Sequence, residues 1–117
     1  MIIAVVGQES LPDAQSLLHV LEGEFPDATV DLRASKLPNV NYRVSVEQPD
    51  SSSFTVTKFD QGQLSCDGTE SQDCRVAAAV RAALRDDFPR VVAITDDGSM
   101  YVDLVAGITP EEIRTGW

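Results

Sequence analysis

The sequence predicts an α+β fold, a single two-layer domain in which a mixed, mostly antiparallel sheet of about five to six strands carries two main helices on one face and a short C-terminal helix. Two almost wholly apolar runs, 2–6 and 91–94, are typical of strands buried on both faces. Other stretches alternate apolar and polar residues, as half-buried antiparallel strands do. Two further segments repeat apolar residues at helical spacing. With 117 residues, the whole of 1–117 is expected to form one domain.

A buried strand followed by an amphipathic helix is expected at the start of the chain. The apolar run 2–6 ends at Gly7, and Ser10, Pro12 and Asp13 then supply a cap, an early proline and a first-turn acid. Phe25-Pro26 ends this helix, because the residue before a proline is disfavoured in helical conformation. The apolar positions of the helix are Leu11, Ala14, Leu17, Leu18, Leu21 and Phe25.

Strands with one solvent-exposed face are expected to follow. Residues 28–35 and 41–47 alternate apolar and polar side chains. A turn is predicted at 49–52, and 54–59 begins the return strand of a hairpin. A second turn at 60–62 leads to a brief extension of the sheet at 64–66.

The second half of the chain predicts another helix and another hairpin. A helix from about Asp73 to Asp87, capped by Asp73, has an apolar side and an arginine-rich side. Strand 91–94 leads through Asp97-Gly98, a strong two-residue hairpin signal, into a strand near 100–105. We expect 91–94 to lie beside 2–6 and parallel to it. The segment 109–112, Thr-Pro-Glu-Glu, is typical of a helix start, so a short final helix is predicted to dock through Ile113 and Trp117.

The chain is strongly acidic, with 19 Asp and Glu against 9 Lys and Arg and a net charge of −10. A protein that binds phosphate backbones normally carries a basic stripe, so direct nucleic-acid binding is not expected. The apolar runs are too short to cross a membrane, and no Lys or Arg precedes the first of them as in a secretory signal, so we expect a cytoplasmic protein without a membrane partner. Solubility, docking of a basic protein and cation binding are competing explanations of the acidity. The first 32 residues hold no Lys or Arg and six acids: Glu9, Asp13, Glu22, Glu24, Asp27 and Asp31.

No motif in the sequence is specific enough to name a reaction, so no catalytic residue, metal ligand or cofactor is predicted. His19 is the only histidine, which excludes a multi-histidine metal site, and it is expected to be solvated. The acids near Asp96 and Asp97 lack the ligand spacing of a calcium loop and are better explained as a hairpin tip. Cys66 and Cys74 match no zinc or redox motif, and either free thiols or a disulfide between them remains open.

The leading functional hypothesis is a small non-enzymatic module that binds another protein, with Glu22, Glu24, Asp96 and Asp97 as interface candidates. A concrete version is an acidic inhibitor or immunity-like protein that neutralises a basic enzyme such as a nuclease. The rival is a small ligand-binding protein or enzyme that uses the Cys66–Cys74 loop and Ser10 or Glu9 near the end of the first strand. A third hypothesis is self-association through an exposed hairpin edge.

Overall fold

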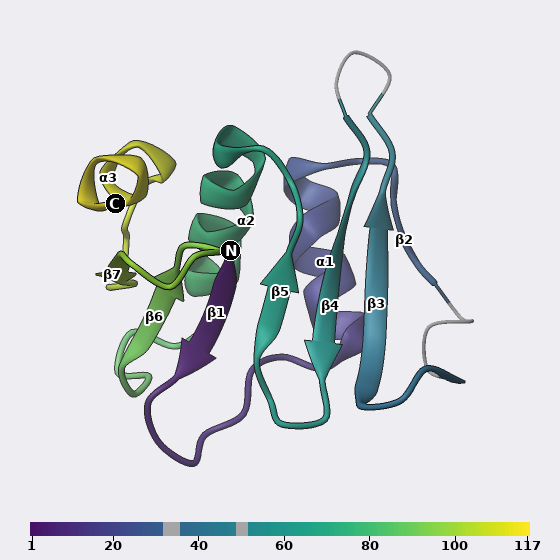
Figure 1. The fold of residues 1–117 in the computed structure, drawn as a ribbon, viewed down its shortest axis with the longest axis horizontal. Coiled ribbons are helices and arrows are strands. Elements are labelled where there is room, and N and C mark those ends of the chain that lie inside the picture. The colour runs from purple at the N-terminus through teal and green to yellow at the C-terminus, as the bar shows by residue number, and fades with distance from the viewer. Residues whose placement is uncertain (32–35, 49–51) are drawn as a thin grey trace.

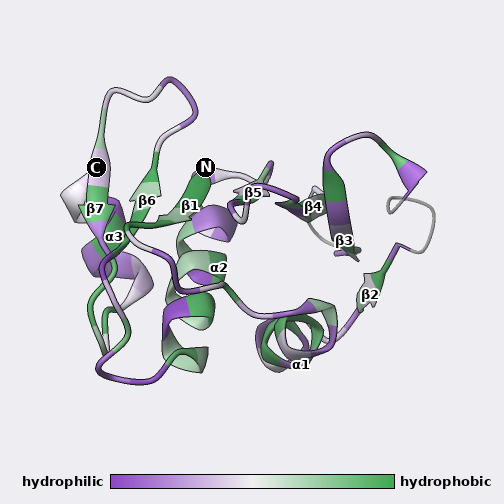
Figure 2. Cartoon of the chain, turned by 90° about the horizontal axis from the view of Figure 1, so that it is seen from below, coloured by the Kyte–Doolittle hydropathy of each residue, from purple (hydrophilic) through white to green (hydrophobic). Residues whose placement is uncertain are grey.

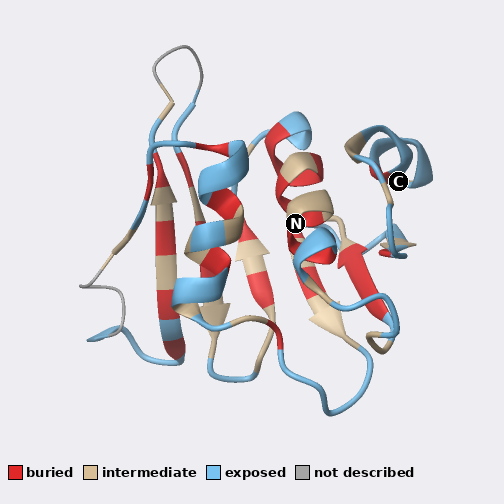
Figure 3. Ribbon diagram, turned by 180° about the vertical axis from the view of Figure 1, so that it is seen from behind, coloured by how far each residue is buried: buried red, intermediate tan, exposed pale blue. Residues whose placement is uncertain are grey.

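The computed structural model describes residues 1–31, 36–48 and 52–117, and its helices and strands confirm the predicted α+β class. Over these residues, seven strands form one sheet, and α1 and α2 lie side by side across one of its faces (Figures 1 and 3). Helix α3 packs against α2 beside the β7 edge. The elements in chain order are β1 (Ile2–Val5), α1 (Ala14–Glu24), β2 (Ala28–Val30), β3 (Val40–Val46), β4 (Phe54–Phe59), β5 (Leu64–Cys66), α2 (Glu70–Ala83), β6 (Val91–Ile94), β7 (Tyr101–Asp103) and α3 (Pro110–Gly116).

The strand order is β2-β3-β4-β5-β1-β6-β7, and every neighbouring pair is antiparallel. The expected adjacency of the two apolar strands is confirmed, because Ile2 of β1 lies opposite Ile94 of β6. The expected parallel direction is wrong. Helix α2 carries the chain from the end of β5 back to the start of β6, so β5 and β6 run the same way, with β1 inserted between them in the opposite direction. The sheet is therefore antiparallel rather than mixed, and it has one strand more than the largest number expected.

The helix boundaries follow side-chain caps. The Asp13 side chain, not Ser10, caps α1 and accepts a hydrogen bond from the Ser16 N–H at 2.9 Å. Helix α2 begins earlier than expected, because Thr69 and Gln72 form a reciprocal capping box before Asp73 is reached. It also ends earlier, at Ala83, and the Leu84 N–H that follows donates to the Arg81 carbonyl.

The C-terminal third agrees closely with the sequence. Thr109 and Glu112 form the expected capping box of α3, with a proline in its first turn. Gly98 at the tip of the β6–β7 hairpin has a φ of 72°, which favours glycine. Of the predicted strand 28–35, β2 covers Ala28–Val30, and residues 32–35 lie outside the described residues. Residues 49–51 of the predicted turn also lie outside them.

The core lies between the sheet and the helices. Phe25, at the end of α1, packs edge-on against Phe54 of β4 with ring centroids 5.1 Å apart. No helix in the described ranges is long and apolar enough to span a membrane, and α2, the longest, has 14 residues. Side chains with no exposed surface come from both layers: Leu17, Leu21, Val44, Val56, Val76, Val80 and Ile113.

Candidate functional site

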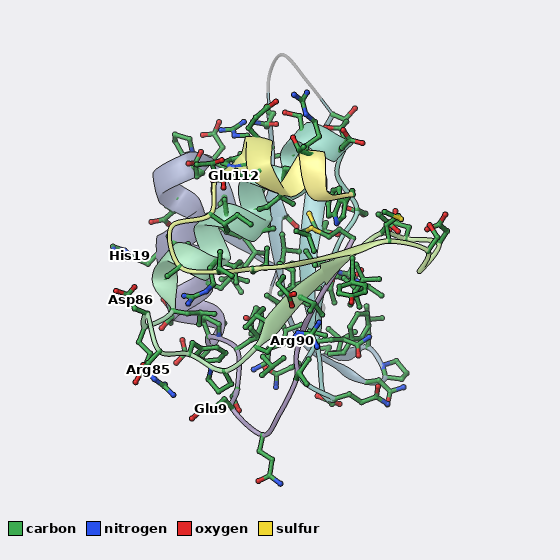
Figure 4. The ribbon with its side chains drawn as sticks, turned by 90° about the vertical axis from the view of Figure 1, so that its left-hand side faces the viewer. Glu9, His19, Arg85, Asp86, Arg90 and Glu112 are labelled. Atoms are coloured by element: carbon green, nitrogen blue, oxygen red, sulfur yellow. The ribbon has the colours of Figure 1, made fainter. Side chains whose placement is uncertain are left out.

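Of the four carboxylates predicted from the sequence, Glu22, Glu24 and Asp96 lie near the start of α2. Asp97 lies in the β6–β7 hairpin, which projects from the face of the sheet opposite the helices (Figures 2 and 4). Glu22 and Glu24 are on the last turn of α1, and Glu24 Oε2 is 3.3 Å from the Arg75 guanidinium of α2. Asp96 and Asp97 are in the β6–β7 hairpin. Figure 1 shows the end of α1 and the start of α2 at one end of the molecule, with the N-terminus nearby.

We call the end of the domain at which α1 ends and α2 begins the acidic end. Helix α3 also begins there, and Figure 4 shows Glu112 at this end, opposite the end that carries Asp86. Acids in the first turn of a helix stabilise it through the helix dipole, so α2 and α3 both favour carboxylates at this position. The acidic end comprises Glu22, Glu24, Glu70, Asp96, Glu111 and Glu112.

A cleft of about 200 Å³ opens within the acidic end between α2, the β6–β7 hairpin and the C-terminus. Three carboxylates, those of Glu70, Asp73 and Asp96, line it, and the Met1 amino group is its one cation. Trp117 forms part of the wall, with its indole N–H donating to a backbone carbonyl. The charge lining the cleft is therefore negative.

Asp73 is the buried member of this group, with 6% of its surface exposed. Its carboxylate accepts from the Gly68 N–H at 3.1 Å and lies 3.7 Å from the Met1 amino group, which also contacts Asp96 and donates to the Cys66 carbonyl at 3.0 Å. Burial raises the pKa of Asp73, while the Cys66 thiol and the amino group act in the opposite direction. Asp73 therefore belongs to the floor of the cleft, not to its accessible rim.

The Asp97 carboxylate has a structural role in its own hairpin. Asp97 accepts from the Ser99 N–H at 3.0 Å and from the hydroxyl groups of Thr95 and Ser99, which fixes the hairpin turn. By contrast, the carboxylates of Glu22 and Glu70 form no hydrogen bond or ion pair within the part of the chain that the structure describes. These two are the carboxylates best able to pair with a partner.

The two cysteines lie beside the cleft as free thiols, so the disulfide that the sequence left open is not formed. They face different surroundings, because Cys66 hydrogen bonds to Asp73 whereas Cys74 lies against the start of α3 near Glu111 and Arg114. Burial raises the pKa of both thiols, that of Cys74 to about 11. Both remain protonated at neutral pH, which argues against their use as nucleophiles.

Ser10 and Glu9 of the rival hypothesis lie away from the acidic end, as does His19, which is predicted to be solvated. His19 is exposed on α1, and it lines a shallow groove of about 660 Å³ between α1 and the end of α2, together with Ser10 and Ser16. Glu9 pairs with Arg85 at 3.0 Å, and Figure 4 shows this pair near Asp86, at the end opposite Glu112.

Sequence analysis missed Glu70, Asp73 and Trp117 as members of one site. The spacing of Thr69 and Gln72 is a capping-box signal that would have placed Glu70 in the first turn of α2. No comparable local signal brings Trp117 or the Met1 amino group to Asp73, because these contacts depend on the strand order. Comparison of the chain with protein-family models, curated proteins and solved structures finds no match.

Proposed function

We propose that this protein is a non-enzymatic binding module whose acidic end docks a basic region of another protein. One observation carries the proposal: three carboxylates converge on the cleft beside Trp117, and one of them, Glu70, has no partner of its own among the described residues. Complementary charge raises the rate of association and selects the partner.

The cleft suggests how a basic side chain would bind. A lysine or arginine of the partner would enter between Glu70 and Asp96, and the indole of Trp117 offers a nearby aromatic surface for cation–π contact. Glu22, with a free carboxylate at the end of α1, would widen the charged surface around this contact. A concrete form of the proposal is inhibition of a basic enzyme, such as a nuclease, by occupation of its phosphate-binding surface.

The test compares two double variants with the same change in net charge. Glu22→Lys with Glu70→Lys reverses the unpaired carboxylates of the acidic end, whereas Asp60→Lys with Asp86→Lys reverses exposed acids at the opposite end. None of the four carboxylates has a hydrogen-bond or ion-pair partner in the described ranges, so both variants should fold.

Tagged wild type and both variants are used to capture proteins from a lysate of the source cells at low and moderate salt, with quantitative mass spectrometry. The proposal expects basic proteins that the wild type and the Asp60/Asp86 variant retain, that the Glu22/Glu70 variant loses, and that are released as salt rises. If both double variants lose the basic proteins equally, capture depends on net charge alone and the proposal is overturned. It is also overturned if both variants capture the same proteins as the wild type.

A further inference from the structure

The cleft of the acidic end has a floor that the chain itself fills with a cation. The Met1 amino group lies 3.7 Å from Asp73 Oδ2, donates to the Cys66 carbonyl at 3.0 Å and contacts Asp96 Oδ1. An ammonium group therefore already lies between two of the three carboxylates that line the cleft. Any further cation must bind above it, in the outer part of the cleft.

The outer part of the cleft is bordered by Glu70, Asp96 and Trp117. The Glu70 carboxylate is exposed, and it forms no hydrogen bond or ion pair with any described residue. The Asp96 side chain is 83% exposed and contacts the amino group through Oδ1, so its Oδ2 remains available to a second donor. The outer part thus offers acceptors from two different elements, the first turn of α2 and the β6–β7 hairpin.

Trp117 contributes carbon surface to the outer part. Its indole N–H donates to the Ala93 carbonyl at 3.2 Å, so the polar atom of the ring is already used on β6. What the side chain adds to the wall of the cleft is aromatic carbon. Among aromatic side chains, tryptophan attracts cations most strongly.

The acceptors border the outer part instead of meeting at one point. Among the residues that the structure describes, no three carboxylate, thiol or imidazole groups are placed to hold one metal ion. The position between Asp73 and Asp96, where two carboxylates do meet one small cation, is taken by the amino group. A cation with donors on several edges can reach Glu70 and Asp96 separately, whereas a compact cation cannot.

These properties distinguish the two basic side chains. A guanidinium is planar, carries five N–H donors in a fork that matches a carboxylate, and is weakly hydrated, so it packs well on aromatic carbon. The lysine ammonium is compact and strongly hydrated, so it loses more hydration when it lies against an indole. The outer part of the cleft meets the requirements of the first group better than those of the second.

We propose that the outer part of the cleft is a subsite for one arginine side chain. The guanidinium forks onto Glu70, donates through a further N–H to Asp96, and packs against the indole of Trp117. The cleft, at about 200 Å³, has room for the end of one such side chain. This inference rests on the proposed function, and it narrows the partner from a basic region to a region that presents an exposed arginine.

The test is a titration of the isotope-labelled protein by nitrogen–proton NMR correlation spectra at constant ionic strength. The probes are three tripeptides with blocked ends: Gly-Arg-Gly, Gly-Lys-Gly and Gly-citrulline-Gly. Trp117 is the only tryptophan, so its indole N–H gives a single signal that reports on the cleft. The arginine peptide should shift this signal and the amides of Glu70 and Asp96, with a dissociation constant about tenfold below that of the lysine peptide. Citrulline, which has the same shape without the charge, should not bind.

Matched variants locate the effect. Glu70→Gln removes the charge onto which the guanidinium forks and should weaken the arginine peptide about fivefold. Glu22→Gln makes the same change of charge at the other unpaired carboxylate, outside the cleft, and should bind like the wild type. Trp117→Leu keeps an apolar wall without the aromatic ring and should bring the affinities for arginine and lysine within about threefold of each other. The dispersion of each spectrum shows whether the variant is folded.

Equal affinity for arginine and lysine overturns the inference, and so does binding that leaves the Trp117 signal unmoved or the absence of binding at millimolar peptide. The proposed function survives each of these results, because the comparison of double variants in a lysate depends on the carboxylates and not on the kind of cation. Conversely, a Glu22/Glu70 variant that keeps its captured proteins overturns the proposed function whichever peptide binds.

Discussion

Arg81 of α2 provides the sharpest test of how the domain is held together. Its side chain is buried, with 4% of the residue exposed, and its guanidinium faces backbone carbonyls instead of a carboxylate. It donates to Leu104 at 3.0 Å and to Leu84, Arg85 and Asp86 at 3.2 to 3.3 Å. The end of α2, the loop after it and the segment after β7 are therefore joined by one side chain.

Arg81→Ala should lower the free energy of unfolding by about 3 to 5 kcal/mol. A hydrogen bond from a charged donor contributes about 1.5 to 3 kcal/mol, and a carbonyl left buried without a donor costs about 1 to 3 kcal/mol. Part of this loss of unfolding free energy is offset, because Arg85 and Asp86 are exposed and water can reach their carbonyl groups. Domains of this size have total stabilities of about 5 to 15 kcal/mol, so the loss would be large.

Urea denaturation followed by circular dichroism measures the effect. With a slope of about 2 kcal/mol per molar urea, the midpoint should fall by about 1.5 to 2.5 M at unchanged slope. Arg81→Met keeps most of the volume without the donors and should also be strongly destabilised, whereas Arg114→Ala removes only an exposed ion pair with Glu111 and should cost less than about 1 kcal/mol. Wild-type stability in the methionine variant, or a loss in Arg81→Ala no larger than in Arg114→Ala, would refute the role of the hydrogen bonds.

Three further predictions concern the hairpin, α3 and the thiols. Hydrogen bonds from Ser99 and neighbouring groups lower the pKa of Asp97 from 3.8 to about 2. Its carboxylate therefore stabilises the fold above pH 4, and this contribution is lost as pH falls from about 4 to about 2. In urea titrations over that pH range, Asp97→Asn should make the free energy of unfolding depend less steeply on pH. Thr109→Ala removes the cap of α3 and should lower the unfolding free energy by about 1 kcal/mol, a loss that an unchanged urea midpoint would contradict. Because burial keeps Cys66 and Cys74 protonated, alkylation by iodoacetamide at pH 8 should be slow in the folded protein and fast in urea, as peptide mass spectrometry would show.

Elements governed by local signals could be predicted from the sequence. The Thr109-Pro110 start of α3 and the Asp97-Gly98 turn are determined within a few residues, and both are confirmed. Helix α1 begins later than the sequence predicts, because the backbone before it makes tertiary contacts. The Leu11 carbonyl accepts from Lys58, and the Pro12 carbonyl accepts from the Tyr42 hydroxyl, so these carbonyls are used outside the helix.

Features governed by topology could not be predicted in the same way. The apolar character of β1 and β6 correctly predicted that they are neighbours, but their relative direction depends on the crossover through α2. The candidate site also combines features that the sequence predicts with features that depend on the topology. Composition identified acidic residues on α1 and on the hairpin, whereas the cleft depends on Asp73 being buried beside an amino group that the strand order brings there.

The central position of β1 has a consequence for the kinetics of folding. Ile2 pairs with Ser65 on one side and Ile94 on the other, and without β1 the sheet would divide into β2–β5 and β6–β7. To pair β1 with β5 and β6, the long chain segments between these strands must close into loops, which costs chain entropy before the contacts are gained. Folds dominated by such distant pairings are slow to form. During synthesis β1 leaves the ribosome long before β6 and β7 exist, so the hairpins of β2–β5 can form early while the complete sheet must wait until residue 103 has emerged.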